Sequence, residues 1–522
     1  MLNFRKLRIV SIILAVLVLT CVPGFTESVY PLPDKPELTI WTTIDADLSL
    51  FGYSSYADAP GFKAWQEATG VTANIEEAAD GTALLLRLAS GELPDIIRSS
   101  KEFYSKGFEA MLSEGLAIDL GEYLPEHAPN YWAYLQSSDN IYKSAAVDVN
   151  GELRIISFAG NFYPETSPYR NYSGIMVRKD FMDKLGMEKI TTVDEFYTFL
   201  SRCKNELGVP TPLMSQNTLN EFIWNHGYFT SPFGLASGAG YQVDGVYHFG
   251  AYEKEFKDFL IFMNKLYTEG LFDPNFTVTD NSTAIAAMSN GTSAAISCMV
   301  SRFQVVLTAT QDPELQLVAI PSLTANDGER AMMGYATTLS APSFWCFVTE
   351  ECKNIEAALR FLDYLFSSKG LDLANYGVEG ETFTYDENGV AQLTEFVTKN
   401  PDGYAIDPIL RAYGLLNWST IHRQEFSEKR FPLQQQRDAC VTWANNDHMK
   451  YMISYYSVPT ELQEEYTRLW TDISTYLKEM IANFISGTEP IDKFDDFQNT
   501  LKDLNIERYI EIMQLAIDPY YK

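Results

Sequence analysis

The chain has 522 residues, of which 46% are hydrophobic and 14% aromatic, so it is long enough for more than one domain with a large core. Its 69 acidic and 39 basic residues give a net charge of −30, which argues against nucleic acid and anionic membrane surfaces as partners, because both favour a basic face. An acidic ligand stays compatible with this charge, since a few local Arg or Lys residues act at short range.

The N-terminus has the pattern of an export signal. Three basic residues within the first eight precede an apolar run that ends at Leu19 and is too short to span a bilayer comfortably. Cys21 follows Val-Leu-Thr, which is typical of a lipoprotein signal except that Thr replaces the usual Gly, Ala or Ser. Lipidation of Cys21 and ordinary cleavage near Glu27 therefore both stay open. We expect a signal at 1–26 and a Pro-rich tether at 27–36.

The other five cysteines have no regular spacing, which predicts buried free thiols at Cys203, Cys298, Cys346, Cys352 and Cys440. A Cys346–Cys352 bridge is the alternative. No pair of His or Cys residues has zinc-ligand spacing, and no loop has the calcium-binding pattern, so we expect neither a metal site nor a cofactor.

The stretch from 38 to 97 predicts alternating strands and helices. A short helix carries Phe62 and Trp65 at three-residue spacing and ends at Gly70. A second helix is expected at 82–89, and strands at 38–41, 71–75 and 96–97. Because such crossovers are right-handed, this order builds a parallel sheet.

Further elements follow in chain order. Thr192 and Glu195 form the pattern of a capping box at the start of a helix. Residues 159–172 are aromatic, Pro-rich and without periodicity, so a loop is expected there. A hairpin is predicted at 147–157, strands at 173–179, 291–299 and 315–320, and helices at 253–269, 283–288, 355–367 and 461–485.

Several runs of the sequence resemble one protein family. TIWT at 39–42, FKAWQEATGV at 62–71 and LLLRLASGELPDII at 84–97 resemble the first lobe of family 1 extracellular solute-binding proteins, the capture subunits of bacterial ABC importers. VRKDFMDKLG at 177–186 and YGVEGETFTYDENG at 376–389 extend the resemblance. It implies an α/β fold of two lobes, like the periplasmic binding proteins, with a hinge and a cleft between the lobes.

The resemblance also implies a division of the chain. We expect residues 37–157 plus 292–340 to form the N-terminal lobe, and 158–291 plus 341–522 the C-terminal lobe. The chain would cross between lobes near 158–172, 292–298 and 335–348.

The resemblance implies a binding protein and not an enzyme. We expect a monomeric, exported protein, anchored to the membrane through Cys21 if that residue is lipidated. It would capture an oligosaccharide by hinge closure and deliver it to ABC permease subunits. The alternatives are capture of a non-sugar solute such as a peptide, a sensing role for a signalling partner, and a secreted polysaccharide-degrading enzyme.

Three candidate ligand contacts lie at or just after the ends of the first predicted strands, at the carboxyl edge where ligands bind in parallel sheets. Trp41 is either such a contact or part of the core. Asp80 is either an acceptor for a sugar hydroxyl or the N-cap of the helix at 82–89. Ser99 is either a site residue or an ordinary loop residue.

Aromatic residues in loops with polar neighbours supply further candidates, because rings cover the C–H faces of sugars while polar groups bind the hydroxyls. They are Tyr163 and Tyr169 in the loop at 159–172, and Trp224 and Phe233 with the polar Asn225 in the charge-poor stretch 211–250. Arg170 beside them is either the partner of a ligand carboxylate or a surface salt bridge.

The remaining candidates lie late in the chain. Trp345, in the second returning crossing, is the foremost candidate for a stacking platform, and Trp418 is a weaker one. Glu379 lies in the prominent YGVEGE motif and is expected to fix a turn more than to bind ligand.

Overall fold

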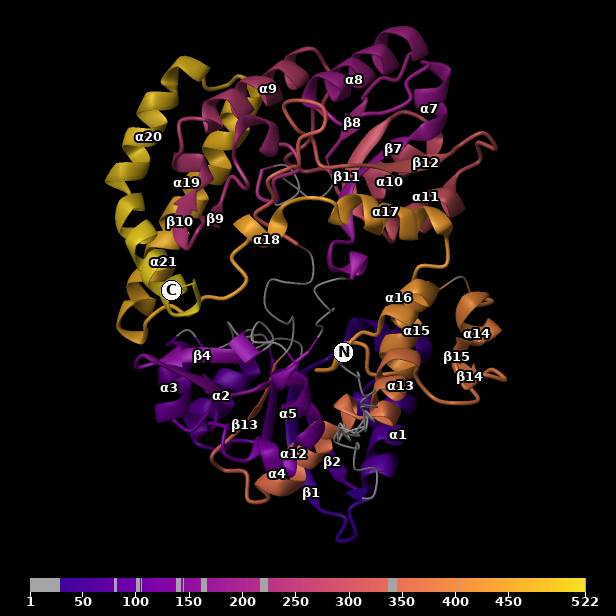
Figure 1. Cartoon of the computed structure of the whole chain (residues 1–522), viewed down its shortest axis with the longest axis vertical. Coiled ribbons are helices and arrows are strands. Elements are labelled where there is room, and N and C mark those ends of the chain that lie inside the picture. Colours follow the sequence, from indigo (N-terminus) through magenta and orange to yellow (C-terminus); the bar gives the residue numbers. More distant parts are fainter. Residues whose placement is uncertain are drawn as a thin grey trace, which may run out of the picture.

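The computed structural model describes residues 29–78, 82–99, 104, 106–137, 142–143, 145–160, 167–215, 224–336, 345–402 and 404–521. Two separate sheets dominate them, one in the lower and one in the upper half of Figure 1.

The first sheet has the order β2-β1-β3-β13-β6. Its strands are β1 (Glu37–Thr43), β2 (Thr72–Ala78), β3 (Ile96–Ser99), β13 (Trp345–Val348) and β6 (Phe158–Ala159). β1 is parallel to β2 and β3, with α1 (Pro60–Thr69) and α2 (Thr82–Ser90) as crossovers, whereas β13 runs antiparallel to β3 and β6. The predicted β-α-β-α-β unit is therefore confirmed.

The second sheet has the order β12-β7-β11-β8. Its strands are β7 (Ser173–Arg178), β8 (Leu213–Met214), β11 (Ala295–Met299) and β12 (Leu317–Ile320). β7 pairs antiparallel with both β11 and β12. The assignment of 292–340 to the N-terminal lobe is therefore wrong at these strands, and the chain makes no crossing at 292–298, because β11 stays beside β7.

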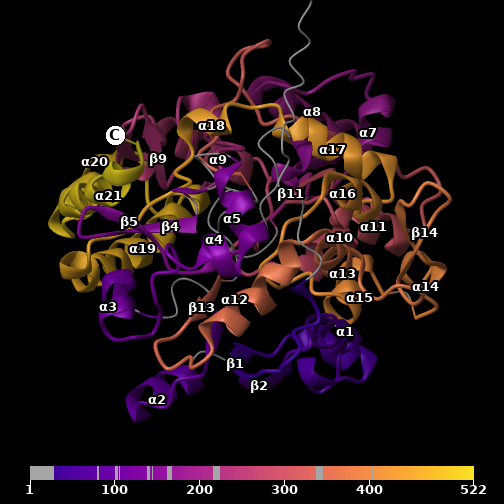
Figure 2. The same cartoon turned by 60° about the horizontal axis from the view of Figure 1, so that its bottom comes forward.

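We name two lobes after these sheets. The first lobe also holds the hairpin β4–β5, the small hairpin β14–β15, and helices α3–α5 and α12–α16. Their bounds are α3 (Gly107–Ser113), α4 (Leu124–His127), α5 (Pro129–Gln136), β4 (Ala146–Val149), β5 (Glu152–Ile155), α12 (Ile355–Asp363), α13 (Ser368–Tyr376), β14 (Phe383–Tyr385), β15 (Ala391–Leu393), α14 (Glu395–Thr398), α15 (Ile406–Tyr413) and α16 (Gln424–Arg430). Figure 2 shows the late helices α12, α13 and α15 beside the N-terminal α1.

The second lobe contains the other helices and the hairpin β9–β10. Their bounds are α7 (Lys179–Lys184), α8 (Val193–Leu207), β9 (Gly240–Val243), β10 (Val246–Phe249), α9 (Phe256–Thr268), α10 (Asn281–Asn290), α11 (Arg302–Ala309), α17 (Gln434–Ala444), α18 (His448–Tyr451), α19 (Gln463–Ser486), α20 (Phe494–Asp503) and α21 (Ile506–Tyr521). The capping box of Thr192 and Glu195 begins α8 as predicted.

Judged from its described residues, the chain changes lobe three times. It leaves the first sheet after β6 and enters the second at β7, and it returns between β12 and β13. A third passage lies between α16 and α17, where Phe431 already packs in the second lobe. The assignment of all of 341–522 to one C-terminal lobe is therefore wrong, since β13 to α16 pack in the first lobe.

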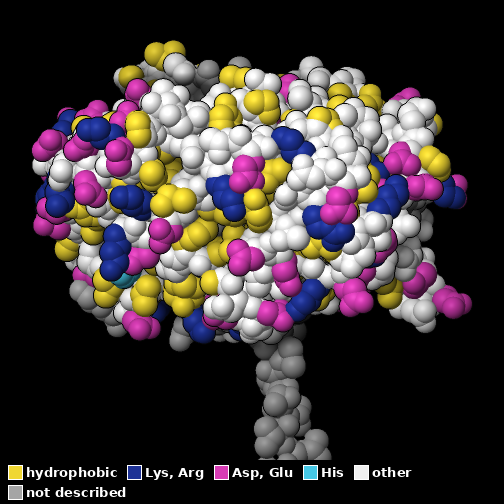
Figure 3. Space-filling model, turned by 90° about the horizontal axis from the view of Figure 1, so that it is seen from above, with side chains coloured by type: hydrophobic (Ala, Val, Ile, Leu, Met, Phe, Trp, Pro, Cys, Tyr) yellow, Lys and Arg dark blue, Asp and Glu magenta, His cyan; other side chains and the backbone are white. Residues whose placement is uncertain are grey.

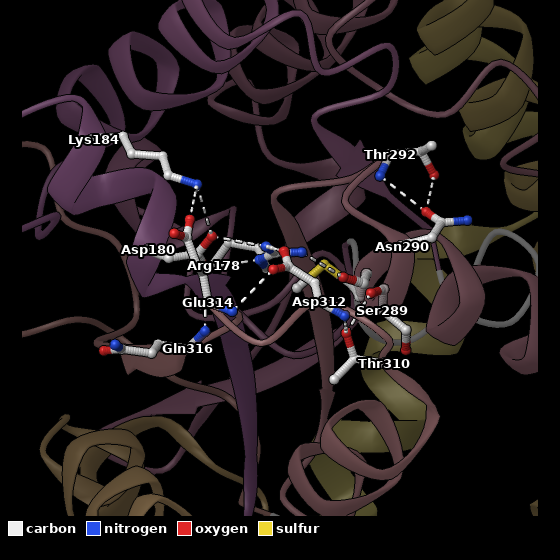
Figure 4. Close-up of polar contacts among 11 residues, drawn as sticks. Arg178, Asp180, Lys184, Ser289, Asn290, Thr292, Thr310, Asp312, Glu314 and Gln316 are labelled. Carbon is white, nitrogen blue, oxygen red and sulfur yellow. Dashed lines mark hydrogen bonds and ion pairs between the residues drawn. The ribbon is translucent and has the colours of Figure 1, made fainter.

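A buried arginine ties the end of β7 to its neighbours (Figure 4). The Arg178 side chain is fully buried, donates to both carboxylate oxygens of Asp180 at 2.8 and 2.7 Å, and reaches Asp312 at 2.7 Å. It also donates to the Met288 carbonyl at 3.1 Å. Because every charge in this cluster has a partner, we read it as structural.

Two other sequence expectations concern packing. The end of the predicted tether lies on the first lobe, because Tyr30 Oη donates to the Arg360 carbonyl at 2.7 Å and Leu32 N donates to the Thr69 carbonyl at 2.8 Å. The tether prediction is therefore wrong for residues 30–32.

The five cysteines after Cys21 are buried and free, as expected. Within the described residues, no helix has both the length and the apolar character needed to cross a bilayer.

Candidate functional site

Three adjoining hollows form a groove along the first half of α19. We call them inner, middle and outer, with volumes of about 520, 390 and 710 Å³. The inner and middle hollows share Tyr456, Tyr466 and Trp470, and the middle and outer hollows share Gln463 and Thr467. The three hollows are therefore continuous, and each has the size of a small-molecule site.

The groove lies between the two lobes. Its middle hollow is lined by Tyr104, Gly107 and Phe108 of the first lobe and by residues 456–458 and α19 of the second. Beyond the groove, Tyr520 in α21 reaches the first lobe, where its hydroxyl accepts a hydrogen bond from Asp148 N at 3.1 Å. In Figure 1, α21 lies next to β4 on this side of the molecule.

The sequence of α19 explains why aromatic rings face the groove. Its core stripe has four-residue spacing, with Leu469, Ile473, Leu477 and Ile481 all buried. Tyr466 and Trp470, also four apart, lie on the neighbouring face and are only half-buried. Both rings stack on Tyr509 of α21, with ring centroids 5.6 and 5.5 Å away and interplanar angles of 18° and 23°.

A second stacked pair lines the inner hollow. The His226 imidazole lies parallel to the Tyr335 ring, with centroids 3.7 Å apart and an interplanar angle of 2°. Burial lowers the pKa of His226 to about 3, so the ring is neutral and offers one donor and one acceptor. Burial also raises the pKa of the Tyr247 phenol, which therefore stays protonated. These groups suit hydroxyl-bearing ligands.

Trp345 supports the groove from behind. Its ring is 2% exposed and stacks on Phe108, with centroids 5.9 Å apart and an interplanar angle of 16°. Phe108, not Trp345, lines the middle hollow. A platform role for Trp345 is therefore not what this structure shows; the residue positions Phe108.

Four further candidates lie in the interior. Trp41 belongs to the first-lobe core, the second of the two readings left open for it, and Ser99 is buried within β3, paired with Trp345. Tyr169 packs on Phe431 in the second-lobe core. The stacking prediction for Trp418 is wrong, because its ring is buried among Phe62 and Trp65 under the Arg98 guanidinium.

The other candidates divide three ways. Of the three neighbouring candidates for ligand contacts, Asn225 lines the inner hollow, whereas Trp224 is buried and Phe233 packs on α9. Arg170 is buried, so it is not a surface salt bridge; its guanidinium lies 3.6 Å from Met449 Sδ. Glu379 is exposed in a turn before β14, away from the three hollows. Asp80, Tyr163 and Cys21 lie outside the described residues.

Most of the aromatic residues that line the groove were not predicted from the sequence, namely Tyr104, Phe108, Tyr247, Tyr335, Tyr456, Tyr466, Trp470 and Tyr509. One signal was present, because Tyr466 and Trp470 repeat at helical spacing beside a complete core stripe. Nowhere in the described ranges do three or more His, Cys, Asp or Glu side chains gather closely enough to hold a metal ion.

Comparisons with known proteins agree with this architecture. The family model of the bacterial extracellular solute-binding proteins matches residues 52–371. Lipoprotein LipO of Bacillus subtilis is 24% identical over 385 residues, which cover 66% of this chain and 71% of LipO.

Solved structures share the fold over nearly the whole chain. Alginate-binding protein AlgQ2 has a TM-score of 0.71 at 19% identity, covering 93% of this chain and 98% of its own. An HMO-binding, ABC-transporter-associated protein from Bifidobacterium longum infantis has a TM-score of 0.72 at 16% identity, covering 94% and 99%. FusA of S. pneumoniae, solved with kestose, has a TM-score of 0.70 at 17% identity, covering 93% and 99%.

The family model spans more than half of the chain, and the two-lobe fold with a groove between the lobes accompanies it. The chain belongs to the bacterial extracellular solute-binding protein family.

Proposed function

We propose that this protein captures an oligosaccharide in the groove between its lobes and delivers it to the permease of an ABC importer. The observation that supports this proposal most strongly is the aromatic lining of the groove. Both lobes contribute to it, and amide, hydroxyl and neutral imidazole groups supplement it. Sugars present C–H faces that rings cover and hydroxyl rims that such polar groups bind.

The lining favours sugar capture over the two rival functions. A peptide ligand needs charged anchors for its termini, and glycan hydrolysis needs two carboxylates across the substrate. The described side chains of the inner and middle hollows are aromatic, aliphatic, amide or hydroxyl groups, one imidazole and the thioether of Met513. They match a passive binding site best.

The relatives support the same reading. AlgQ2 is described as alginate-binding, FusA as an ABC-transporter substrate-binding protein solved with kestose, and the Bifidobacterium protein as an HMO-binding, ABC-transporter-associated protein. LipO is a lipoprotein, which supports export of this chain and attachment to the membrane through a lipid on Cys21.

The two lobes give the mechanism. Ligand held by Trp470 on one side and Phe108 on the other favours the closed arrangement, so binding and closure are one equilibrium. The closed form then offers both lobe surfaces to the permease.

A thermal-shift screen of the mature chain against glycans and peptides tests this proposal. A ligand at a hundred times its dissociation constant adds about 2.7 kcal/mol of stability, which is an easily measured shift. We expect stabilisation by a glycan. Stabilisation by peptides alone would contradict capture of sugars, and new reducing ends in the glycan mixture would reveal an enzyme.

A further inference from the structure

We infer that the groove selects an uncharged glycan and discriminates against uronic-acid polymers. This inference rests on the proposed function and deepens it. It concerns a choice that the relatives leave open, because they include both an alginate-binding protein and one solved with kestose.

The first observation is the charge of the lining. Every described residue that lines the inner and middle hollows is uncharged. The single imidazole, His226, is 4% exposed and stacked on Tyr335, and burial keeps it neutral. A carboxylate on each sugar unit would leave water here without a cation among the described lining residues to receive it, which is costly.

The second observation is where the groove's charges begin. They appear in the outer hollow, where Lys106 and Arg468 face Glu464 and Asp472, two cations against two anions. Lys106 is also paired with Glu114 at 2.8 Å. On α19, Arg468 lies four residues from both Glu464 and Asp472, so it has anionic neighbours on its own helix face. The described charges of the outer hollow are therefore balanced and offer no cationic fork to a polyanion.

The third observation is the net negative charge of the whole chain and the electrostatic field that it produces. Its net charge of −30 repels polyanions at low ionic strength, and acidic and basic side chains are interspersed over the face shown in Figure 3. A groove for acidic glycans needs a local cluster of cations to overcome this field. The described lining of the inner and middle hollows contains no such cluster and instead presents rings, which stack on sugar faces whatever their hydroxyl pattern.

The test is a calorimetric titration of the mature chain with matched oligomers. Manno-, xylo-, cello- and fructo-oligosaccharides form the neutral arm, and oligogalacturonate and alginate oligomers of equal length form the acidic arm. We expect a neutral oligomer to bind at least tenfold tighter than any acidic one. Its affinity should change less than twofold between 20 mM and 500 mM salt, because no ion pair contributes.

The outcomes separate this inference from the proposed function. An acidic oligomer that binds tightest, with affinity falling steeply in salt, would overturn the inference and leave oligosaccharide capture standing. Binding of peptides in place of every glycan would overturn both. Gln463→Arg, which introduces a cation between the middle and outer hollows, should narrow the preference for neutral oligomers; no change in that preference would also count against the inference.

Discussion

The side chain of Trp470, like those of Tyr456 and Tyr466, lines both the inner and the middle hollow of the proposed binding surface. Trp470→Ala should weaken glycan binding more than tenfold, which corresponds to at least about 1.4 kcal/mol, whereas Trp470→Phe should keep much of the affinity because a ring remains. Calorimetry measures both. Tyr123→Ala, which removes an exposed first-lobe aromatic outside the three hollows, is the control. Equal affinities for wild type and Trp470→Ala would contradict the placement of the site.

Asp363 is the buried carboxyl from which we expect a pH effect on stability. It is 1% exposed and accepts hydrogen bonds from Asn130 Nδ2 at 2.6 Å and Tyr131 N at 2.7 Å. Burial raises its pKa from 3.8 to about 7, so the folded state holds the proton more tightly than the unfolded state. Its contribution is fully present below about pH 4 and is lost as the pH rises to about 7, by an amount on the order of 4 kcal/mol.

Asp363→Asn should therefore flatten this part of the pH profile. Urea unfolding at several pH values between 4 and 8 measures the effect. Asp34→Asn, at an exposed position, should leave the profile as in wild type. If the free energy of unfolding of Asp363→Asn changed with pH as it does in the wild type, the Asp363 carboxyl would not be the cause of the pH dependence.

Among the elements, helix α1 is followed by Gly70, which ends the helix and also leaves room for a close contact with residues 30–32. Gly70 has φ +73°, and a Cβ there would lie 2.8 Å from the Leu32 carbonyl oxygen, because residues 30–32 pack against this turn. Gly91 after α2 has the same φ of +73° with nothing within 4 Å. Gly70→Ala should therefore cost more than the roughly 1 kcal/mol expected for Gly91→Ala. Thermal unfolding of the two variants compares them; equal losses would mean that the contact with Leu32 adds nothing.

Elements formed by local patterns were predictable, and their partners were not. Gly70 and the capping box of Thr192 are local signals, and both elements formed as expected. By contrast, the short apolar strand β11 carries no information on whether it pairs with β3 or β7, so its lobe was misassigned. The prediction of the binding site was wrong for a similar reason. Trp345 and Trp418 are of the residue type that can form a stacking platform, but only the tertiary packing shows that both are buried.

At the scale of the whole molecule, the proposed capture of a ligand involves closure of the two lobes. The first lobe supplies Phe108 and the second supplies Trp470, so we expect a ligand that contacts both to draw the lobes together. Small-angle X-ray scattering should show a smaller radius of gyration with a bound neutral oligosaccharide than without it. An unchanged radius at saturating ligand would contradict closure while leaving binding intact.

The measurement that tests the central claim most directly is a comparison of amide hydrogen exchange in the mature chain with and without its tightest neutral oligosaccharide. We predict slower exchange in α3, in residues 453–458 and in the first half of α19, which together border the groove on both lobes. Protection confined to one lobe, or to surfaces away from α19, would contradict capture in this groove.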